Sequence, residues 1–208
     1  MSDIVIPPDA IVSDDTKRDQ RIPPGQVRTR KWPILHAGET PQYSDLNSQW
    51  DFYVFGEVTE NRRWTWPEFA ALERSQVYAD MHCVTRWSKL DNVWDGVRTR
   101  ALLKYITPRP TAKFVMVHCE AGFTTNLPID DFFGEDCVFA FAHNGQILDP
   151  DHGYPVRLVV PRLYAWKSAK WVRGIEFLTR DVPGFWERFE NGGYHMRGDP
   201  WTEERFRP

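Results

Sequence analysis

The first residues that could carry chemistry lie in Met81-His82-Cys83-Val84-Thr85-Arg86-Trp87-Ser88, where one thiol stands between an imidazole and a guanidinium. Polar and cationic neighbours favour the thiolate form of a Cys, and a thiolate is both a nucleophile and a soft metal ligand. A free Cys is also commonly a small buried hydrophobe. The stretch therefore predicts either a reactive or metal-binding Cys83 or a packed one.

Two His-Cys pairs, His82-Cys83 and His118-Cys119, contain residue types that bind zinc. Their spacing argues against a structural zinc site, because the sequence has no Cys-x-x-Cys and no two His one helical turn apart. A Cys-His hydrolase is a second possibility, since any of the six His could activate Cys83. The sequence does not fix that partner.

A third possibility is a soft metal held by the Cys83 thiolate and otherwise coordinated by an organic cofactor. Such a cofactor would be large and anionic, and it would need cationic side chains and N–H groups from several loops. The chain offers these groups in three regions: Arg28, Arg30, Lys31 and His36; Thr124, Thr125 and Asn126; and His152, Arg157, Ser168 and Lys170. This inventory permits the cofactor without requiring it.

The composition of the 208-residue chain indicates one globular core. Ten Trp and sixteen Pro predict a rigid, loop-rich body with large aromatic anchors. A net charge of -3 with dispersed Lys and Arg excludes a nucleic-acid footprint, and no apolar run reaches the length of a membrane span. Three Cys without paired spacing argue against disulfides, and the N-terminus shows no export signal. We therefore expect a cytoplasmic protein.

Apolar and β-branched runs predict more strands than helices. Strands are expected over 49–58, 78–84, 113–119, 137–143, 157–161 and 170–178. Short helices are expected over 65–75, 94–106 and 181–191. A polar loop is expected over 120–126 and a hairpin turn at Asn144-Gly145.

The same patterns predict the organisation of the chain. Residues 1–27 are rich in Pro and mixed charge, which predicts an extended N-terminal arm, and residues 28–208 are expected to form one domain. Because no βαβ rhythm is visible, we expect an α+β fold built mainly of antiparallel sheet.

Two segments resemble the signature of the sulfite-oxidase-type molybdopterin domain. The segment His152 to Pro161, followed by Tyr164 to Trp171, is similar to the part of that family that binds the pyranopterin and its phosphate. The segment Cys83 to Ser88 is similar to the one that carries the molybdenum-ligating Cys, most closely in the small bacterial oxidoreductases. The motifs stand in the family's order and spacing, and the resemblance covers about Trp32 to Trp201.

This resemblance implies the cofactor and the residues that bind it. The cofactor would be molybdopterin with molybdenum, the metal ligand would be Cys83, and the fold would be the family's mixed, mainly antiparallel sheet body. Cys119 and Cys137 are assigned to the core. The residues expected against the pterin and its phosphate are His152, Arg157, Ser168, Ala169 and Lys170, with Lys31, His36, Thr124 and Thr125 placed there less directly.

The activity implied is two-electron oxo transfer on a small polar substrate such as sulfite, a sulfoxide or an N-oxide, supported by an unidentified electron-transfer partner. Arg86, Tyr194 and His195 are the residues expected to orient the substrate. Ser88 stands where sulfite oxidases place a substrate-binding Arg, which argues against sulfite. The alternative from another class is a molybdopterin-binding module without turnover.

Overall fold

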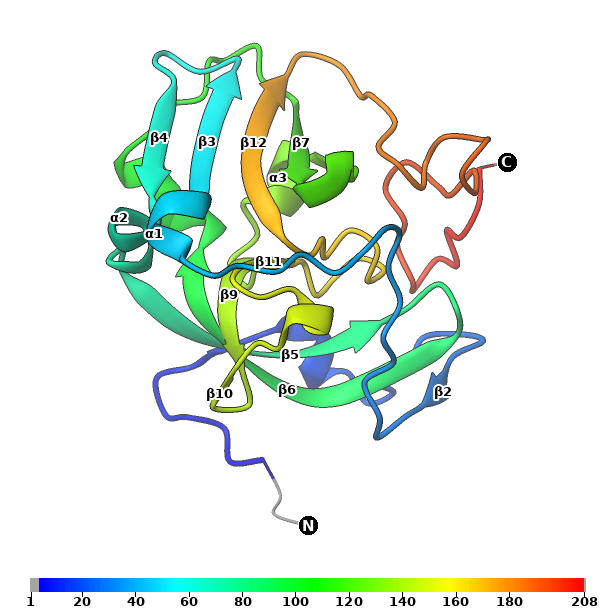
Figure 1. Ribbon diagram of the computed structural model, residues 1–208. Coiled ribbons are helices and arrows are strands. Elements are labelled where there is room, and N and C mark those ends of the chain that lie inside the picture. The colour runs from blue at the N-terminus through cyan, green and yellow to red at the C-terminus, as the bar shows by residue number, and fades with distance from the viewer. Residues whose placement is uncertain (1–3, 208) are drawn as a thin grey trace.

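The computed structural model describes residues 4–207, which fold into two sheets edged by short helices (Figure 1). Residues 1–3 of the expected arm and Pro208 of the expected domain lie outside the described residues. The first sheet contains β1 (Ile11–Val12), β2 (Val27–Arg28), β5 (Arg74–His82), β6 (Trp87–Arg98), β9 (Val138–His143), β10 (Gln146–Ile147) and β11 (Arg157–Val159). The second contains β3 (Asp51–Gly56), β4 (Arg62–Thr65), β7 (Phe114–Cys119), β8 (Thr124–Pro128) and β12 (Val172–Leu178).

Most strand pairs are antiparallel. The long β5–β6 hairpin continues through β9 to β10 and β11, and β4–β3 joins β12–β7–β8. Within residues 4–207, the parallel pairs are β1 with β5, β2 with β6 and β3 with β12. The expected α+β fold with mainly antiparallel sheet is therefore confirmed.

The helices are one or two turns long and lie at the edges of the sheets. The α-helices are α1 (Leu46–Gln49), α2 (Trp66–Ala70) and α3 (Ile129–Phe132), and the 3₁₀ turns are η1 (Asp14–Lys17), η2 (Thr99–Lys104), η3 (Glu120–Gly122) and η4 (Pro150–His152). Helix α2 begins with the expected capping box, because the backbone N–H of Thr65 donates to Glu68 Oε2 at 2.8 Å. It ends at Ala70, earlier than expected.

The main core lies where the two sheets and the short helices meet, and it is rich in aromatic side chains. Phe52, Phe69 and Phe139 are fully buried and contact one another with ring centroids 4.6 to 6.0 Å apart. Burial of such rings contributes the largest apolar areas to a core. Cys119 and Cys137 belong to the same cluster, as expected.

The helix expected over 94–106 is wrong. Residues up to Arg98 belong to β6, which pairs with β5 on one side and β9 on the other, and only the 3₁₀ turn η2 follows. The apolar positions that favoured a helix are Val97, which lies in β6, and Ala101, Leu102 and Tyr105, which lie in or directly after η2. The two neighbouring strands decide the conformation because they satisfy the backbone of β6 on both edges.

The helix expected over 181–191 is also wrong, because residues 181–184 are irregular and residues 185–191 form turns and a bend. Gly184 lies so close to the backbone of Thr124 and Thr125 that a Cβ there would approach them to 2.7 Å. Pro183 and Gly184 disfavour a helix locally, and this close packing fixes the extended path instead. The polar loop expected over 120–126 ends earlier than expected, because residues from Thr124 onward belong to strand β8.

None of the helices formed by residues 4–207 has the length and hydrophobicity that crossing a membrane would require.

Candidate active site

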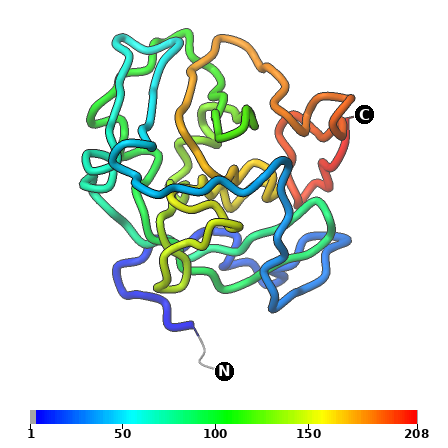
Figure 2. The backbone as a smooth tube through the Cα atoms, in the orientation of Figure 1, coloured from blue at the N-terminus to red at the C-terminus, as the bar shows by residue number. Residues whose placement is uncertain are grey.

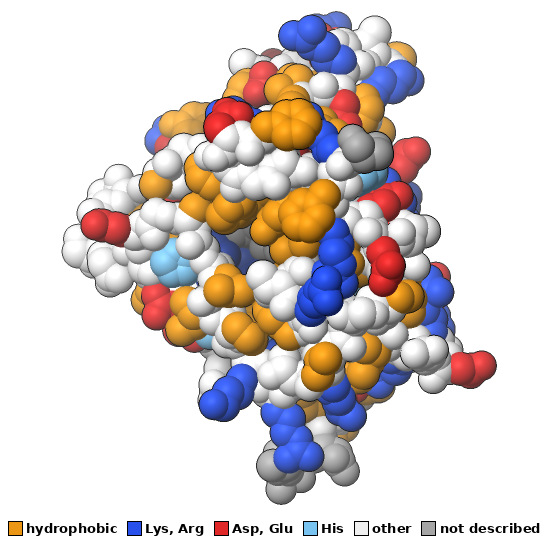
Figure 3. All heavy atoms as spheres, turned by 90° about the vertical axis from the view of Figure 1, so that its right-hand side faces the viewer, with side chains coloured by type: hydrophobic (Ala, Val, Ile, Leu, Met, Phe, Trp, Pro, Cys, Tyr) orange, Lys and Arg blue, Asp and Glu red, His pale blue; other side chains and the backbone are white. Residues whose placement is uncertain are grey.

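A cavity of about 250 Å³ lies where the β5–β6 turn, the loop before α1, the segment before β12 and the C-terminal segment converge. It is lined by Cys83 from the β5–β6 turn, His36 from the loop before α1, Arg157 from β11, Ser168 and Lys170 from the segment before β12, and Tyr194. Seen from the side of the C-terminal segment, the molecular surface has a hollow bordered largely by hydrophobic side chains (Figure 3). Residues more than 100 positions apart in the chain therefore share one pocket.

Cys83 lies in the turn that joins β5 to β6. Its N–H donates to Trp87 O at 2.9 Å and its carbonyl accepts from Arg86 N at 2.9 Å, which closes the turn, with Arg86 at a φ of 72°. The sulfur accepts a hydrogen bond from Thr85 Oγ1 at 3.1 Å. Burial raises the pKa of the thiol.

The expected activation of Cys83 by its cationic neighbours is therefore wrong. His82 points away from the pocket, with Nδ1 2.9 Å from Ser88 Oγ, and burial lowers its pKa to about 4, so the ring is neutral. Arg86 is exposed and does not line the cavity. The protein by itself favours a thiol at Cys83, and a bound metal ion would deprotonate it outright.

The geometry supports neither a Cys-His hydrolase nor a structural zinc site at Cys83. Among residues 4–207, the Cys83 sulfur has Thr85 as its hydrogen-bond partner and no His, so a Cys-His pair is not formed. Within the same residues, no group of three or more His, Cys, Asp and Glu side chains could hold a metal ion. A metal at Cys83 would need most of its coordination from another molecule.

Arg157 is buried beneath the pocket without a carboxylate partner in the described residues. Its Nη1 donates to His152 O and its Nη2 to Ser168 O, both at 2.9 Å, while Nε has no partner. The guanidinium also lies over the rings of Trp32 and Trp94, at 5.1 and 5.5 Å from their centroids. Burial lowers its pKa to about 9, and the charge of Asp149, which forms no ion pair with Arg157, offsets only part of this effect.

Lys170 is the second cation of the pocket. Its Nζ donates to Asp151 O at 2.5 Å, and it forms no ion pair with a carboxylate of residues 4–207. Burial, and then the charge of Arg157, lowers the pKa of Lys170 to about 7. Gly153 permits this crowding, because its φ is 115° and a Cβ there would lie 2.9 Å from the Cβ of Arg157.

Two adjoining desolvated cations, of which Arg157 lowers the pKa of Lys170, fit an anionic group better than an empty pocket. The orphaned Arg157 Nε, the adjacent Lys170 and the buried Cys83 sulfur match the donor set of a phosphate-bearing cofactor whose metal takes one protein thiolate. When bound, such a cofactor supplies the redox chemistry, and the protein supplies the ligand, the anion contacts and the pocket walls.

Sequence reasoning missed the aromatic walls of the pocket and one buried cation. Trp32, Trp87, Trp166 and Trp186 line the cavity, and Trp32 stacks on the His152 ring at 3.9 Å. The high Trp count was the available signal, but it did not say which rings meet. Lys167 lies in the motif segment beside Ser168 to Lys170, and the sequence does not show that its side chain is buried.

Several residues expected at the site lie outside the cavity. Lys31 and Arg86 are exposed, and His195 accepts from the N–H groups of Arg197 and Gly198. His152 lies behind Trp32 and bonds Asp149 through Nδ1 at 2.7 Å, so its contribution here is a carbonyl for Arg157. Thr124 and Thr125 belong to β8, where Thr125 donates to buried Glu187 at 3.2 Å. The expected residues that do meet in the cavity are His36, Cys83, Arg157, Ser168, Ala169, Lys170 and Tyr194.

Fold and site together define a mixed-sheet protein with one buried thiol facing a pocket made for an anionic cofactor. The model of the family described as "oxidoreductase molybdopterin binding domain" matches residues 37–186, so the chain belongs to that family of molybdopterin-dependent oxidoreductases. The expected sulfite-oxidase-type family and its molybdenum cofactor are thereby confirmed.

Relatives span several kinds of enzyme. An uncharacterized oxidoreductase of Bacillus subtilis, YuiH, is 48% identical over 89% of this chain and 92% of its own length. The protein-methionine-sulfoxide reductase catalytic subunit MsrP of Campylobacter jejuni is 26% identical over 72% of this chain, which spans 56% of MsrP. The crystal structure of the sulfane dehydrogenase SoxCD from Paracoccus pantotrophus shares the fold with a TM-score of 0.64, at 19% identity over 75% of this chain and 44% of that one.

Proposed function

We propose that this protein is an oxo-transfer enzyme in which Cys83 is the protein ligand of molybdenum and Arg157, Lys170 and Ser168 hold the phosphate end of the pterin. The observation that carries this proposal is a pair of desolvated cations that form no ion pair with a carboxylate of residues 4–207, in the same cavity as a buried thiol. Bound molybdenum would supply the two-electron chemistry. The chain would contribute the thiolate, the anion contacts and the walls.

We further propose that the substrate is a neutral sulfoxide or N-oxide with apolar substituents. Trp87, Trp166, Trp186 and Tyr194 line the cavity, and its cationic lining within residues 4–207 consists of Arg157, Lys170 and, when protonated, His36. All three belong to segments assigned to the cofactor, and Arg86 lies outside. A sulfite anion would need a further cation, whereas a neutral oxide suits aromatic walls. The name of the related MsrP supports a sulfoxide.

Reduction of a sulfoxide balances as substrate plus two electrons and two protons giving the sulfide and water. The electrons would come from a separate electron-transfer partner. Tyr194 lines the cavity with a pKa raised by burial, so its hydroxyl keeps its proton and can donate a hydrogen bond to the substrate oxygen. This is the role we propose for Tyr194.

The decisive experiment compares wild type with Cys83→Ser, both produced in a host that makes the cofactor. Wild type should hold about one molybdenum per chain and oxidise reduced viologen with methionine sulfoxide or trimethylamine N-oxide, and Cys83→Ser should lose both properties because a hydroxyl is a poor soft-metal ligand. Cys119→Ala is the matched control, since that thiol is buried in the core.

Each outcome decides between the alternatives. Full molybdenum occupancy in Cys83→Ser would contradict the ligand assignment. Bound cofactor without turnover on any oxide or on sulfite would support the silent binding module. Faster turnover of sulfite with ferricyanide than of any oxide with viologen would contradict the proposed substrate class.

A further inference from the structure

The turn that carries Cys83 is held from two sides by segments far away in the sequence. The stretch around β2 lies on one side and the segment after Gly193 on the other, and the blue stretch that contains β2 and the red C-terminal segment both lie on the right of the molecule (Figure 2). Neither Gln26 nor Arg205, the residues that make these contacts, lines the cavity.

Gln26 contacts both ends of the turn. Its Nε2 donates to Cys83 O at 3.0 Å, and its Oε1 accepts from Ser88 Oγ at 3.5 Å. The next residue continues the contact, because Val27 N donates to Arg86 O at 2.9 Å. The side chain of Gln26 therefore spans the turn from its first residue to its last.

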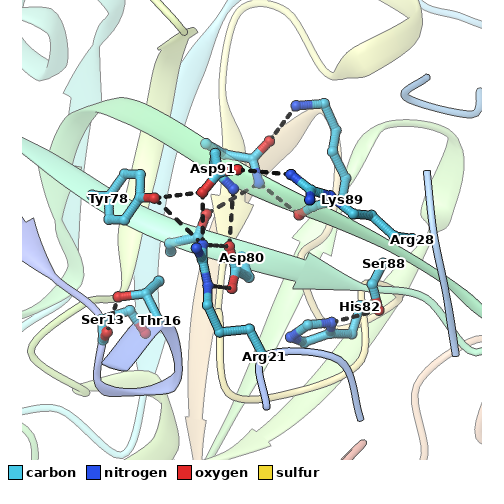
Figure 4. A network of polar contacts seen from close by, with 12 residues as sticks. Ser13, Thr16, Arg21, Arg28, Tyr78, Asp80, His82, Ser88, Lys89 and Asp91 are labelled. Carbon is cyan, nitrogen blue, oxygen red and sulfur yellow. Dashed lines mark hydrogen bonds and ion pairs between the residues drawn. The ribbon is translucent and has the colours of Figure 1, made fainter. Parts of the chain in front are cut away.

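The stretch that carries Gln26 is itself anchored on the β5–β6 hairpin. Arg21 donates to both carboxylate oxygens of Asp80 at 2.9 and 2.6 Å and to Asp91 at 2.8 Å, and Arg28 donates to Asp91 at 3.2 Å (Figure 4). The Asp80 side chain is fully buried, and the N–H of Asp91 donates to it at 2.9 Å. Gln26 thus lies between two arginine anchors on the same pair of strands.

Arg205 contacts the turn from the C-terminal side. Its Nη1 donates to Val84 O at 2.6 Å, and its own carbonyl accepts from His195 N at 3.1 Å. A bridge between Tyr194 and Phe206 runs alongside. Arg205 therefore connects the carbonyl of Val84, which follows Cys83, to the backbone of His195, which follows Tyr194. The side chains of Cys83 and Tyr194 line the same cavity.

We propose that Gln26 and Arg205 are positioning residues that fix the direction of the Cys83 sulfur and its separation from Tyr194. A turn held only by its own hydrogen bonds can change its orientation relative to the sheet. The hydrogen bonds from Gln26 to Cys83 O and from Arg205 to Val84 O restrain this motion from opposite sides. Residues that orient a ligand from behind tune the metal it binds. The proposal rests on Cys83 being the metal ligand.

The first test uses the cofactor-free protein and the rate of Cys83 alkylation by iodoacetamide, read by mass spectrometry of the Cys83 peptide. Arg205→Gln should raise the rate about tenfold and Gln26→Met about threefold, since a charged donor contributes more than a neutral one. Arg205→Lys should restore most of the wild-type rate. Arg188→Gln and Gln20→Ala are matched controls, because both residues are exposed.

The second test uses the loaded protein and its Mo(V) electron paramagnetic resonance spectrum. Arg205→Gln and Gln26→Met should shift the g-values of the bound metal, and Arg205→Lys should return them. A merely structural role would reduce the yield of folded protein without moving these values. Wild-type alkylation rates and spectra in both variants would overturn the proposal, and if Arg205→Gln does not fold, Gln26→Met decides alone.

The two proposals fail differently. If Cys83→Ser keeps molybdenum, the ligand assignment fails while the alkylation rates still report whether the turn is held. If the ligand assignment stands and the rates and g-values do not change, the positioning role fails by itself.

Discussion

The two buried cations Arg157 and Lys167 lie ten residues apart in the chain, and their surroundings differ sharply. Lys167 is completely buried, and its Nζ donates to Glu187 Oε1 at 2.6 Å, to Asn126 O and Oδ1 at 2.7 Å and to Met196 O at 2.6 Å. Arg157 is almost as buried, yet it meets two carbonyls and two indole rings and leaves Nε without a partner.

The difference separates a structural charge from a binding charge. The charge of Lys167 is neutralised inside the protein by Glu187, which also accepts from Trp166 Nε1 at 2.9 Å and thereby holds a wall of the pocket. Arg157 has no such partner among the described residues and faces a cavity. A buried charge left without a counter-ion is costly unless a ligand supplies one, so the absent partner indicates an anionic ligand.

The largest expected effect is on Lys167. In the cofactor-free protein, Lys167→Met should lower the free energy of unfolding by about 3 to 5 kcal/mol, because it leaves Glu187 buried and unpaired. Denaturation in urea measures this. The double variant Lys167→Met with Glu187→Gln should recover part of the loss, and Lys113→Met, at an exposed position, should change little. If Lys167→Met left the free energy of unfolding nearly unchanged, the distinction between a structural Lys167 and a ligand-binding Arg157 would be contradicted.

Arg157→Met should change stability little and cofactor retention strongly. In the cofactor-free protein its stability should stay within about 1 kcal/mol of wild type, because the loss of two hydrogen bonds is offset by removal of a desolvated charge. In the loaded protein the retained pterin should fall about tenfold to a hundredfold, the effect of losing one charge-assisted phosphate contact. Arg188→Met is the exposed control. Equal losses of stability in Arg157→Met and Lys167→Met would contradict this reading.

The third expected effect is a pH dependence from Lys170, whose pKa burial and Arg157 lower from 10.5 to about 7. Between these values the unfolded amine binds a proton that the folded amine lacks, so stability of the cofactor-free protein should rise with pH across that window and stay flat below it. Unfolding midpoints of wild type minus those of Lys170→Met, from pH 6.5 to 10, measure the slope. Sulfate should flatten it by stabilising the charged amine, and an equal slope in both proteins would contradict the assignment.

The sequence determined the cofactor class and most of the strands. The Cys83 segment and the segment from His152 to Trp171 are local motifs, so their residue types and order suffice for recognition. The strands 113–119 and 137–143 are also local, because their buried faces are continuous apolar runs. The capping box is likewise readable from the four residues Thr65 to Glu68.

Only the tertiary structure decided which side chains share the pocket and what charge each carries. The spacing of Trp94 and Val97 fits a helix, but they lie in β6 and belong to different core clusters, and the pairing of β6 with two neighbours settled its conformation. The pKa values of Cys83 and His82 follow from burial that their sequence neighbours do not report. The sequence does not distinguish Arg157 from Lys167, because a counter-ion is a contact in space. Lys167 pairs with Glu187, 20 positions away, and Arg157 forms no ion pair within the described residues.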